Sequence, residues 1–248
     1  MQLIMSGEST AAQFGSFVTG LRMKGETVDE IAGMASVMRK MALSVNYDND
    51  LLDTCGTGGD GLGTFNISTA AAFVSAGIGI KIAKHGNRAM SSHTGSADVL
   101  ESLGININLT PDQVSECIKI SNFGFMFAQG FHPAMKYSGP PRREIGIRTV
   151  FNILGPLTNP AGAQKQLIGV SDPKVGNLIA QSLKRLGSES ALIVHGNDGL
   201  DEITLSDYSQ IWILKNGEIS TEKFYPESVG VNIQSLSNLQ VNNSEESA

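Results

Sequence analysis

The chain has 248 residues, of which 41% are hydrophobic, with a mean hydropathy of -0.02 and a formal charge of -6 at pH 7. No apolar run approaches the ~18 to 20 residues of a membrane span, and the charge is acidic, so we expect neither a membrane protein nor a nucleic-acid binder. Cys55 and Cys117 lack metal-ligand spacing and cannot form a disulfide framework, and the N-terminus does not resemble a secretory signal, so a cytoplasmic protein is predicted.

Two amphipathic helices are predicted between residues 10 and 42. Thr10 with Gln13, and Thr27 with Glu30, have the spacing of a capping box, in which each side chain caps the backbone of the other residue. The "KGET" sequence between them supplies a glycine at which the first helix can end. Polar residues 46–50, "NYDND", then form a linker. We therefore predict a small α-helical domain over residues 1–45.

From residue 46 on, short apolar segments alternate with helical patterns, which is typical of an α/β domain. The expected strands are "LLD" (51–53), "IKIA" (80–83), "FGFMFA" (123–128), "QLIGV" (166–170) and "ALIVHG" (191–196). Helix starts are expected at Thr110-Pro111 and at Asp172-Pro173, the second helix ending at Gly187. The Asn-Gly turn in "ILKNGEI" (213–219) predicts a hairpin. The larger α/β domain, residues 46–248, should contain a mostly parallel central sheet.

The segment 53–69, "DTCGTGGDGLGTFNIST", combines five glycines with five hydroxyl side chains. Glycine backbone N–H groups and hydroxyls are typical phosphate donors. Gly56, Gly58 and Gly61 also fit a dinucleotide-binding motif, but that motif expects an acidic residue ~20 residues later, where this chain has the basic "KHGNR" (84–88). A P-loop would need Gly-Lys-Ser/Thr at the end of the loop. A ligand-free turn is the other alternative, and the hydroxyls disfavour it.

A second polar loop follows the next predicted strand. Lys84, His85, Asn87 and Arg88 come first, and "MSSHTGS" (90–96) adds hydroxyls. Taken alone, the two basic residues would be interpreted as solvated charges and the histidine as a structural hydrogen-bonding group. Because the carboxyl ends of parallel strands meet at one crevice, both loops can face a ligand with phosphates at both ends.

A third loop carries adjacent carboxylates. Asp201 and Glu202, in "GLDEIT" (199–204), follow the strand expected at 191–196. Acidic pairs are common in solvated loops, but beside a polyphosphate they suggest Mg²⁺, which binds oxygen ligands and shares them with phosphates.

Several long motifs in fixed order closely resemble the anthranilate phosphoribosyltransferase family, and the likeness runs from "IMSGEST" to about Val231. These motifs are "GTGGDGLGTFNIST", "KHGNRAMSSHTGSADVLE", "FHPAMKY", "PPRREIGIRTVFNILGPLTNPA" and "HGNDGLDEIT". The resemblance implies that phosphoribosyl pyrophosphate and anthranilate combine to give N-(5-phosphoribosyl)anthranilate and pyrophosphate, with Mg²⁺, in tryptophan biosynthesis. It also implies a homodimer formed through the helical domain, and a chain shortened at both ends relative to the family.

Site residues follow from the resemblance, position by position. For phosphoribosyl pyrophosphate they are Gly56, Gly59, Asp60, Thr64, Asn66, Ile67, Ser68, Thr69, Lys84, Asn87, Arg88, Ser91 and Ser96. For anthranilate they are Gly56, His85, Asn87, Arg142 and Pro156, with His132 and Tyr137 expected near the entrance. Metal positions are Ser68, Asp201 and Glu202. No catalytic base is assigned, and His85 is the candidate.

Two other functions are weighed. Pyrimidine nucleoside phosphorylases share the implied fold but differ in their glycine and basic loops, and they need only inorganic phosphate. A non-catalytic relative that binds nucleic acid is disfavoured by the acidic charge and by the Asp201-Glu202 pair. Cys55 beside the glycine loop is interpreted as a small packed residue rather than a nucleophile, because no base is placed beside it.

Overall fold

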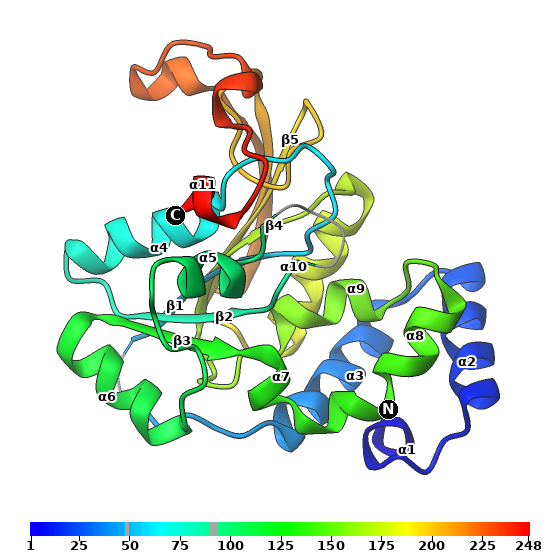
Figure 1. Ribbon diagram of the computed structural model, residues 1–248. Coiled ribbons are helices and arrows are strands. Elements are labelled where there is room, and N and C mark those ends of the chain that lie inside the picture. The colour runs from blue at the N-terminus through cyan, green and yellow to red at the C-terminus, as the bar shows by residue number, and fades with distance from the viewer. Residues whose placement is uncertain (48–49, 90–93) are drawn as a thin grey trace.

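A mostly parallel sheet forms the centre of the computed structural model, which describes residues 1–47, 50–89 and 94–248 (Figure 1). The strand order is β3-β2-β1-β4-β5-β6-β7, in which the first five strands run parallel and β6 pairs antiparallel with both β5 and β7. The strands are β1 (Leu52–Gly56), β2 (Ile82–Gly86), β3 (Phe123–Phe127), β4 (Lys165–Gly169), β5 (Ser190–Gly196), β6 (Ser209–Lys215) and β7 (Glu218–Phe224). The fold class predicted from the sequence is confirmed.

Helices cover both faces of this sheet. In β3, alternate side chains point to opposite faces: Phe125 and Phe127 pack with Leu100 of α5 (Ser96–Ser102), whereas Met126 packs with Ile118 of α6 (Pro111–Ser121). The α5 face also carries α4 (Ile67–Gly77), and α10 (Gly176–Arg185) lies against β5 and β6. In the described part of the chain, no helix has the length and apolarity needed to cross a membrane.

The N-terminal region is helical, and a later segment joins it. It consists of α1 (Gln2–Ser6), α2 (Ala11–Lys24) and α3 (Val28–Met41), and both predicted capping boxes are present. After β3 the chain passes through α7 (Ala128–Phe131) to α8 (Gly139–Ile145) and α9 (Phe151–Leu154), which pack beside α2 and α3 (Figure 1). The rings of Phe14 and Phe151 lie 5.3 Å apart. The range 1–45 for the helical domain stays a prediction.

The other local signals agree with the structure, apart from the lengths of two strands. Thr110 caps α6, Asn216 and Gly217 form the turn of the β6–β7 hairpin with positive φ, and a 3-10 turn, Pro173–Val175, precedes α10. β1, expected at 51–53, continues to Gly56, and β2 is also longer than expected. Its parallel pairing with β3 continues as far as Gly86, so Lys84 and His85 belong to the strand rather than to the loop after it.

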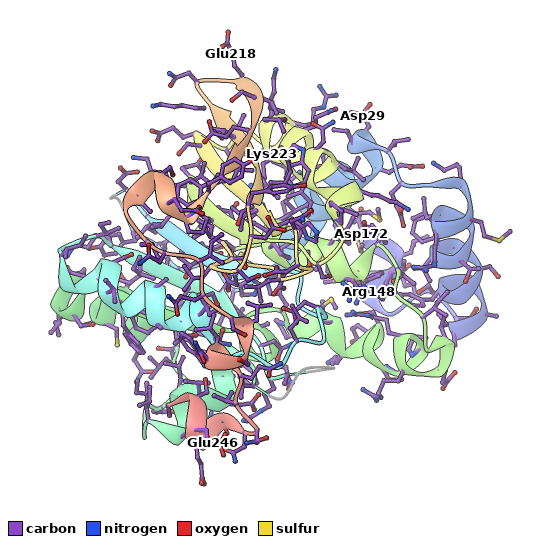
Figure 2. The ribbon with its side chains drawn as sticks, turned by 90° about the horizontal axis from the view of Figure 1, so that it is seen from above. Asp29, Arg148, Asp172, Glu218, Lys223 and Glu246 are labelled. Carbon is purple, nitrogen blue, oxygen red and sulfur yellow. The ribbon has the colours of Figure 1, made fainter. Side chains whose placement is uncertain are left out.

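The segment after β7 returns to the glycine loop. It contains 3-10 turns at Pro226–Val229 and Leu236–Leu239 and ends in α11 (Ser244–Ser247). In Figure 1 the red end of this segment, with α11, lies beside the start of α4. Figure 2 shows Glu246, on α11, at the opposite side of the view from Glu218 at the tip of the hairpin.

Candidate functional site

A cavity of about 370 Å³ lies at the carboxyl ends of the parallel strands. The strand order reverses direction at β1, which has β2 on one side and β4 on the other. Such a switch point is where open α/β sheets bind their ligands. Most of the described cavity lining comes from four parts of the chain, and Met38 of α3 adds to it. The four parts are the glycine loop with the start of α4, the loop after β2 with the start of α5, the segment from α7 to α9, and Asp201 with Glu202.

The start of α4 forms the first wall. Its N-cap is Asn66, whose side chain accepts a hydrogen bond from the Thr69 N–H at 3.0 Å and from the Ser68 hydroxyl at 3.2 Å. The "NIST" sequence is therefore the first turn of a helix and not a continuation of the loop. A helix N-terminus carries unpaired N–H groups and a partial positive charge, so this wall favours an anion.

The start of α5 forms the second wall, close to the first. The Ser96 hydroxyl lies 3.4 Å from the side-chain oxygen of Asn66, so the glycine loop and the loop after β2 face one cavity as predicted. Asp98 fixes the second loop by accepting hydrogen bonds from the N–H groups of Ala89 and Gly95 at 2.8 and 3.0 Å. Asn87 also lines the cavity, and Ser91 lies outside the described residues.

Arg88 lines the cavity, but its charge is already engaged. Its guanidinium donates to the Glu101 carboxylate at 2.8 Å and to Asp98 at 3.3 Å, and it stacks over Phe127 at 5.5 Å from the ring centre. The hydrogen bonds to Glu101 and Asp98 raise the pKa of Arg88 further. In this conformation Arg88 holds the loop to α5. To contact a phosphate, its guanidinium would have to give up a hydrogen bond to one of these carboxylates.

Two of the expected phosphoribosyl pyrophosphate residues do not line the cavity. Thr69 is buried in the first turn of α4. Lys84 is also buried, because β2 directs it into the space under α4, where its ammonium donates to the Thr54 carbonyl and to the Ser68 hydroxyl at 3.0 Å. The ammonium group thus lies behind the wall, supporting Ser68 rather than facing the cavity.

Three carboxylates gather at the floor of the cavity. Asp60, Asp201 and Glu202 all line the cavity, and Asp60 is near enough for its charge to act on Asp201. Burial, and then the charge of Asp60, raise the pKa of Asp201 to about 7. Burial, and then the charge of Asp201, raise the pKa of Glu202 to about 8. The protein compensates the negative charges of these acids poorly, so a bound cation would stabilise the ionised carboxylates.

Gly169 at the end of β4 explains how the acidic loop reaches the sheet. A Cβ atom at this position would overlap the backbone oxygen of Asp201. On the neighbouring strand, Gly56 pairs with Gly169, and a Cβ there would lie 3.2 Å from the Asp201 carboxylate. Only glycine at position 169 permits this approach, so the end of β4 sets the place of the carboxylates.

This donor set fits Mg²⁺ better than a closed metal site. No group of three or more His, Cys, Asp or Glu side chains within the described ranges is placed to hold a metal by itself. Mg²⁺ commonly takes one or two protein carboxylates and fills its other positions with water and substrate phosphates. Asp201, Glu202 and the Ser68 hydroxyl, all at the cavity, are oxygen donors of this kind.

A more apolar part of the cavity lies toward the helical region. Arg142 of α8 enters it and stacks over Phe151 at 5.3 Å, and Pro156 lines the same part. Burial lowers the pKa of Arg142. Among the described residues no hydrogen bond or ion pair engages its guanidinium, so two parallel N–H donors are free for a planar anion.

Two buried histidines, His85 of β2 and His132, also line the cavity. The rings of His85 and His132 lie 5.0 Å apart, and His132 bonds the Thr158 carbonyl at 3.1 Å. Burial, with the nearby His132, lowers the pKa of His85 to about 3. His85 is therefore neutral at pH 7 and a weak proton acceptor, which makes it a poor general base.

Other residues at the site differ from the expectations. Arg148, at the junction between the helical region and the sheet in Figure 2, lines the cavity and donates to the Gly58 carbonyl at 3.2 Å; no sequence motif had indicated this contact. Tyr137 does not line the cavity but packs against Gly7. Cys55 lines it from the sheet, and burial raises its thiol pKa, so it stays protonated and packed as expected.

Comparisons with known proteins agree with this geometry. A family model described as the α/β domain of a glycosyl transferase family matches residues 48–248, and the helical bundle domain of a glycosyl transferase family matches residues 1–42. The anthranilate phosphoribosyltransferase of Moorella thermoacetica is 55% identical over 240 residues, which are 96% of this chain and 71% of that protein. The chain belongs to the anthranilate phosphoribosyltransferase family.

Solved structures of anthranilate phosphoribosyltransferases match the whole fold. The enzyme from Thermus thermophilus has a TM-score of 0.94 and 43% identity, over 100% of this chain and 74% of that chain. The enzyme from Saccharomyces cerevisiae in complex with phosphoribosyl pyrophosphate and Mg has a TM-score of 0.88 and 31% identity, over 96% of this chain and 66% of that chain. The yeast enzyme has also been solved with 4-fluoroanthranilate. The family predicted from the sequence is confirmed.

Proposed function

We propose that the chain transfers the phosphoribosyl group of phosphoribosyl pyrophosphate to anthranilate, releasing pyrophosphate. The observation that carries this proposal is the convergence of two helix N-termini and an acidic pair on one cavity, with a free guanidinium at its apolar end. The helix N-termini suit the phosphates of a ligand, and the free guanidinium suits an aromatic carboxylate.

The donor would bind along the glycine loop and the two helix starts. Backbone N–H groups of the loop, together with Asn66, Ser68 and Ser96, would hold its phosphates, and Asp60 would accept from the ribose hydroxyls or from metal-bound water. Asp201, Glu202 and Ser68 would hold Mg²⁺. When bound, this ion neutralises charge on the phosphates of the donor and of the departing pyrophosphate.

The acceptor would bind between Arg142 and Pro156, with its carboxylate on the guanidinium and its ring near His85. The bond from the anomeric carbon to pyrophosphate breaks, a bond to the amine nitrogen forms, and the amine releases a proton. Glycosyl transfers pass through a state with oxocarbenium character, so the main task of the protein is to hold the amine beside that carbon. An aromatic amine is neutral at pH 7, and the low pKa of His85 fits a site without a strong base.

The two remaining parts of the proposal concern assembly and location. Leu3, Phe17 and Met23, on α1 and α2, are 62%, 41% and 84% exposed, and these apolar side chains support a homodimer formed through the N-terminal helices. Sedimentation of the purified chain would test this by its mass. The cysteines, Cys55 and Cys117, are both free, which supports a reducing cytoplasm as its location.

Loss of anthranilate fluorescence tests the proposed activity. The signal should fall only when phosphoribosyl pyrophosphate and Mg²⁺ are both present, and stoichiometric pyrophosphate should appear. Uridine or thymidine with inorganic phosphate is the matched control. Cleavage of these nucleosides with no loss of anthranilate would overturn the proposal in favour of a phosphorylase.

A further inference from the structure

Residues 236–248, here called the strap, pair with the glycine loop although they lie far from it in sequence. The Phe65 N–H donates to the Leu239 carbonyl at 2.8 Å, and the Val241 N–H donates to the Gly63 carbonyl at 2.9 Å. Thr64 and Gln240 form an antiparallel bridge between these two bonds. The strap therefore adds a short second strand to a loop that belongs to the edge of the cavity.

Side chains of the strap extend this contact in both directions. The Gln240 amide donates to the Leu62 carbonyl at 3.0 Å, and the Ser247 hydroxyl accepts from the Asn66 N–H at 2.9 Å. The strap thus contacts every residue from 62 to 66, up to the N-cap of α4. At its other side, Ser244 and Ser102 share a hydrogen bond of 3.0 Å between their hydroxyls, which ties the strap to α5.

The glycine loop needs such support because its backbone is unusually free. Gly58, Gly59, Gly61 and Gly63 all have positive φ, a conformation that glycine reaches easily and also leaves easily. Ordering a free backbone residue costs conformational entropy. A loop that is ordered before the ligand arrives spares the binding step this cost.

We propose that the strap is a positioning element that holds the glycine loop in its phosphate-binding conformation and thereby lowers the KM for phosphoribosyl pyrophosphate. This inference rests on the proposed function. It also predicts that the strap acts through the order of the loop in the free protein, because no residue of the strap lines the described cavity.

Val241→Pro tests the proposal by removing the N–H that donates to Gly63. Ile233→Pro is the matched control, because residue 233 is exposed and its N–H has no partner in the described part of the chain. In Val241→Pro, amide hydrogen exchange of residues 62–66 without substrate should become faster. The KM for phosphoribosyl pyrophosphate should rise about fivefold, the equivalent of one net hydrogen bond, while kcat and the KM for anthranilate stay within about twofold.

Gln240→Ala is the second variant, in case the proline prevents folding; it removes only the side-chain bond to Leu62 and should give the same pattern with a smaller change. Unchanged exchange in the loop would overturn the proposal. Faster exchange with kcat and both KM values changed together would also overturn it, because a general loss of structure has that effect. A parent chain without transferase activity would contradict the proposed function instead, and loop exchange would still decide whether the strap orders the loop.

Discussion

Lys84 shows how a basic residue beside the proposed phosphate site can be buried behind the wall of the cavity. Its side chain is buried, burial lowers its pKa, and the nearby carboxylate of Asp53 opposes that change. From the sequence, the "KHGNR" motif correctly indicated which loop reaches the cavity. It could not show that the strand continues through Lys84, because that depends on pairing with Phe125, 41 positions later. This pairing decides whether the Lys84 side chain points into the cavity or is buried behind its wall.

Arg142→Ala should raise the KM for anthranilate about tenfold or more, because a charge-assisted contact is worth about 1.5 to 3 kcal/mol. The KM for phosphoribosyl pyrophosphate should change little, since the guanidinium lies at the other end of the cavity. Steady-state kinetics against both substrates provide the measurement. Arg143→Ala is the control, because Arg143 is exposed on the same helix and does not line the cavity. Equal weakening of both substrates in Arg142→Ala would contradict the assignment.

The double variant Asp201→Asn, Glu202→Gln removes two charges but keeps the shape of both side chains. Mg²⁺-dependent turnover should fall by at least about a hundredfold, since the donors that share Mg²⁺ with the phosphates are lost. Turnover titrated with Mg²⁺ measures this effect, and Glu227→Gln, at an exposed site, is the control. A double variant with the same Mg²⁺ dependence as the parent would show that the pair is only a solvated loop.

At the scale of elements, the positions of the strands could be predicted, but the ends of β1 and β2 and the return of the chain to the glycine loop could not. Apolar segments indicated β1 to β5 and the β6–β7 hairpin, and the rule that parallel strands share one edge brought the loops after β1, β2 and β5 together. The strap gave no signal, because its pairing with residues 63–65 is made by backbone groups about 175 positions apart. Hydrophobic periodicity cannot report such bonds. The packing of α8 and α9 on the N-terminal helices was missed for a similar reason.

Gly169→Ala tests the link between β4 and the acidic loop. The added Cβ would overlap the Asp201 backbone oxygen, so the loop must move away from the sheet. Mg²⁺ dependence should weaken and the protein should lose about 1 to 3 kcal/mol of stability, as overpacked sites commonly do. Gly20→Ala in α2, where nothing lies within 4 Å, is the control and should be neutral or slightly stabilising. Wild-type turnover in Gly169→Ala would show that the loop can bind Mg²⁺ from another position.

At the scale of the whole molecule, the acidic pair makes stability depend on pH. The pKa values of Asp201 and Glu202 are about 7 and about 8 in the folded chain, above the ~4 of an unfolded carboxyl group. The unfolded chain therefore loses these protons first, and the free energy of unfolding falls as pH rises from about 4 to 8. With EDTA present, the melting temperature of the parent should fall between pH 4 and pH 8 by more than the melting temperature of the double variant Asp201→Asn, Glu202→Gln. Added Mg²⁺ should make this difference between the two proteins smaller.

Melting curves at pH 5 and pH 8, with and without Mg²⁺, give the measurement for both proteins. The double variant is expected to melt higher than the parent at pH 8 in EDTA, because it buries no unpaired charge at these two positions. At pH 5 the two should converge, since the folded parent is then protonated at both sites. A parent that is more stable than the variant at pH 8 without Mg²⁺ would contradict the proposed electrostatic cost.

The segment between β3 and β4 supplies a separate part of the cavity. Residues 128–158 contribute Arg142, Pro156 and His132 to the cavity, and the sheet edge and its loops contribute every group proposed for the phosphates and for Mg²⁺. Most of the groups proposed for the acceptor thus lie in one continuous stretch of about thirty residues, outside the stretches proposed to hold the phosphates, and His85 of β2 is the exception. Substitutions in that stretch can change which aromatic amine is accepted without altering the residues proposed to hold the phosphates and Mg²⁺. This division gives the fold a simple route by which enzymes with the same donor can diverge in their acceptors.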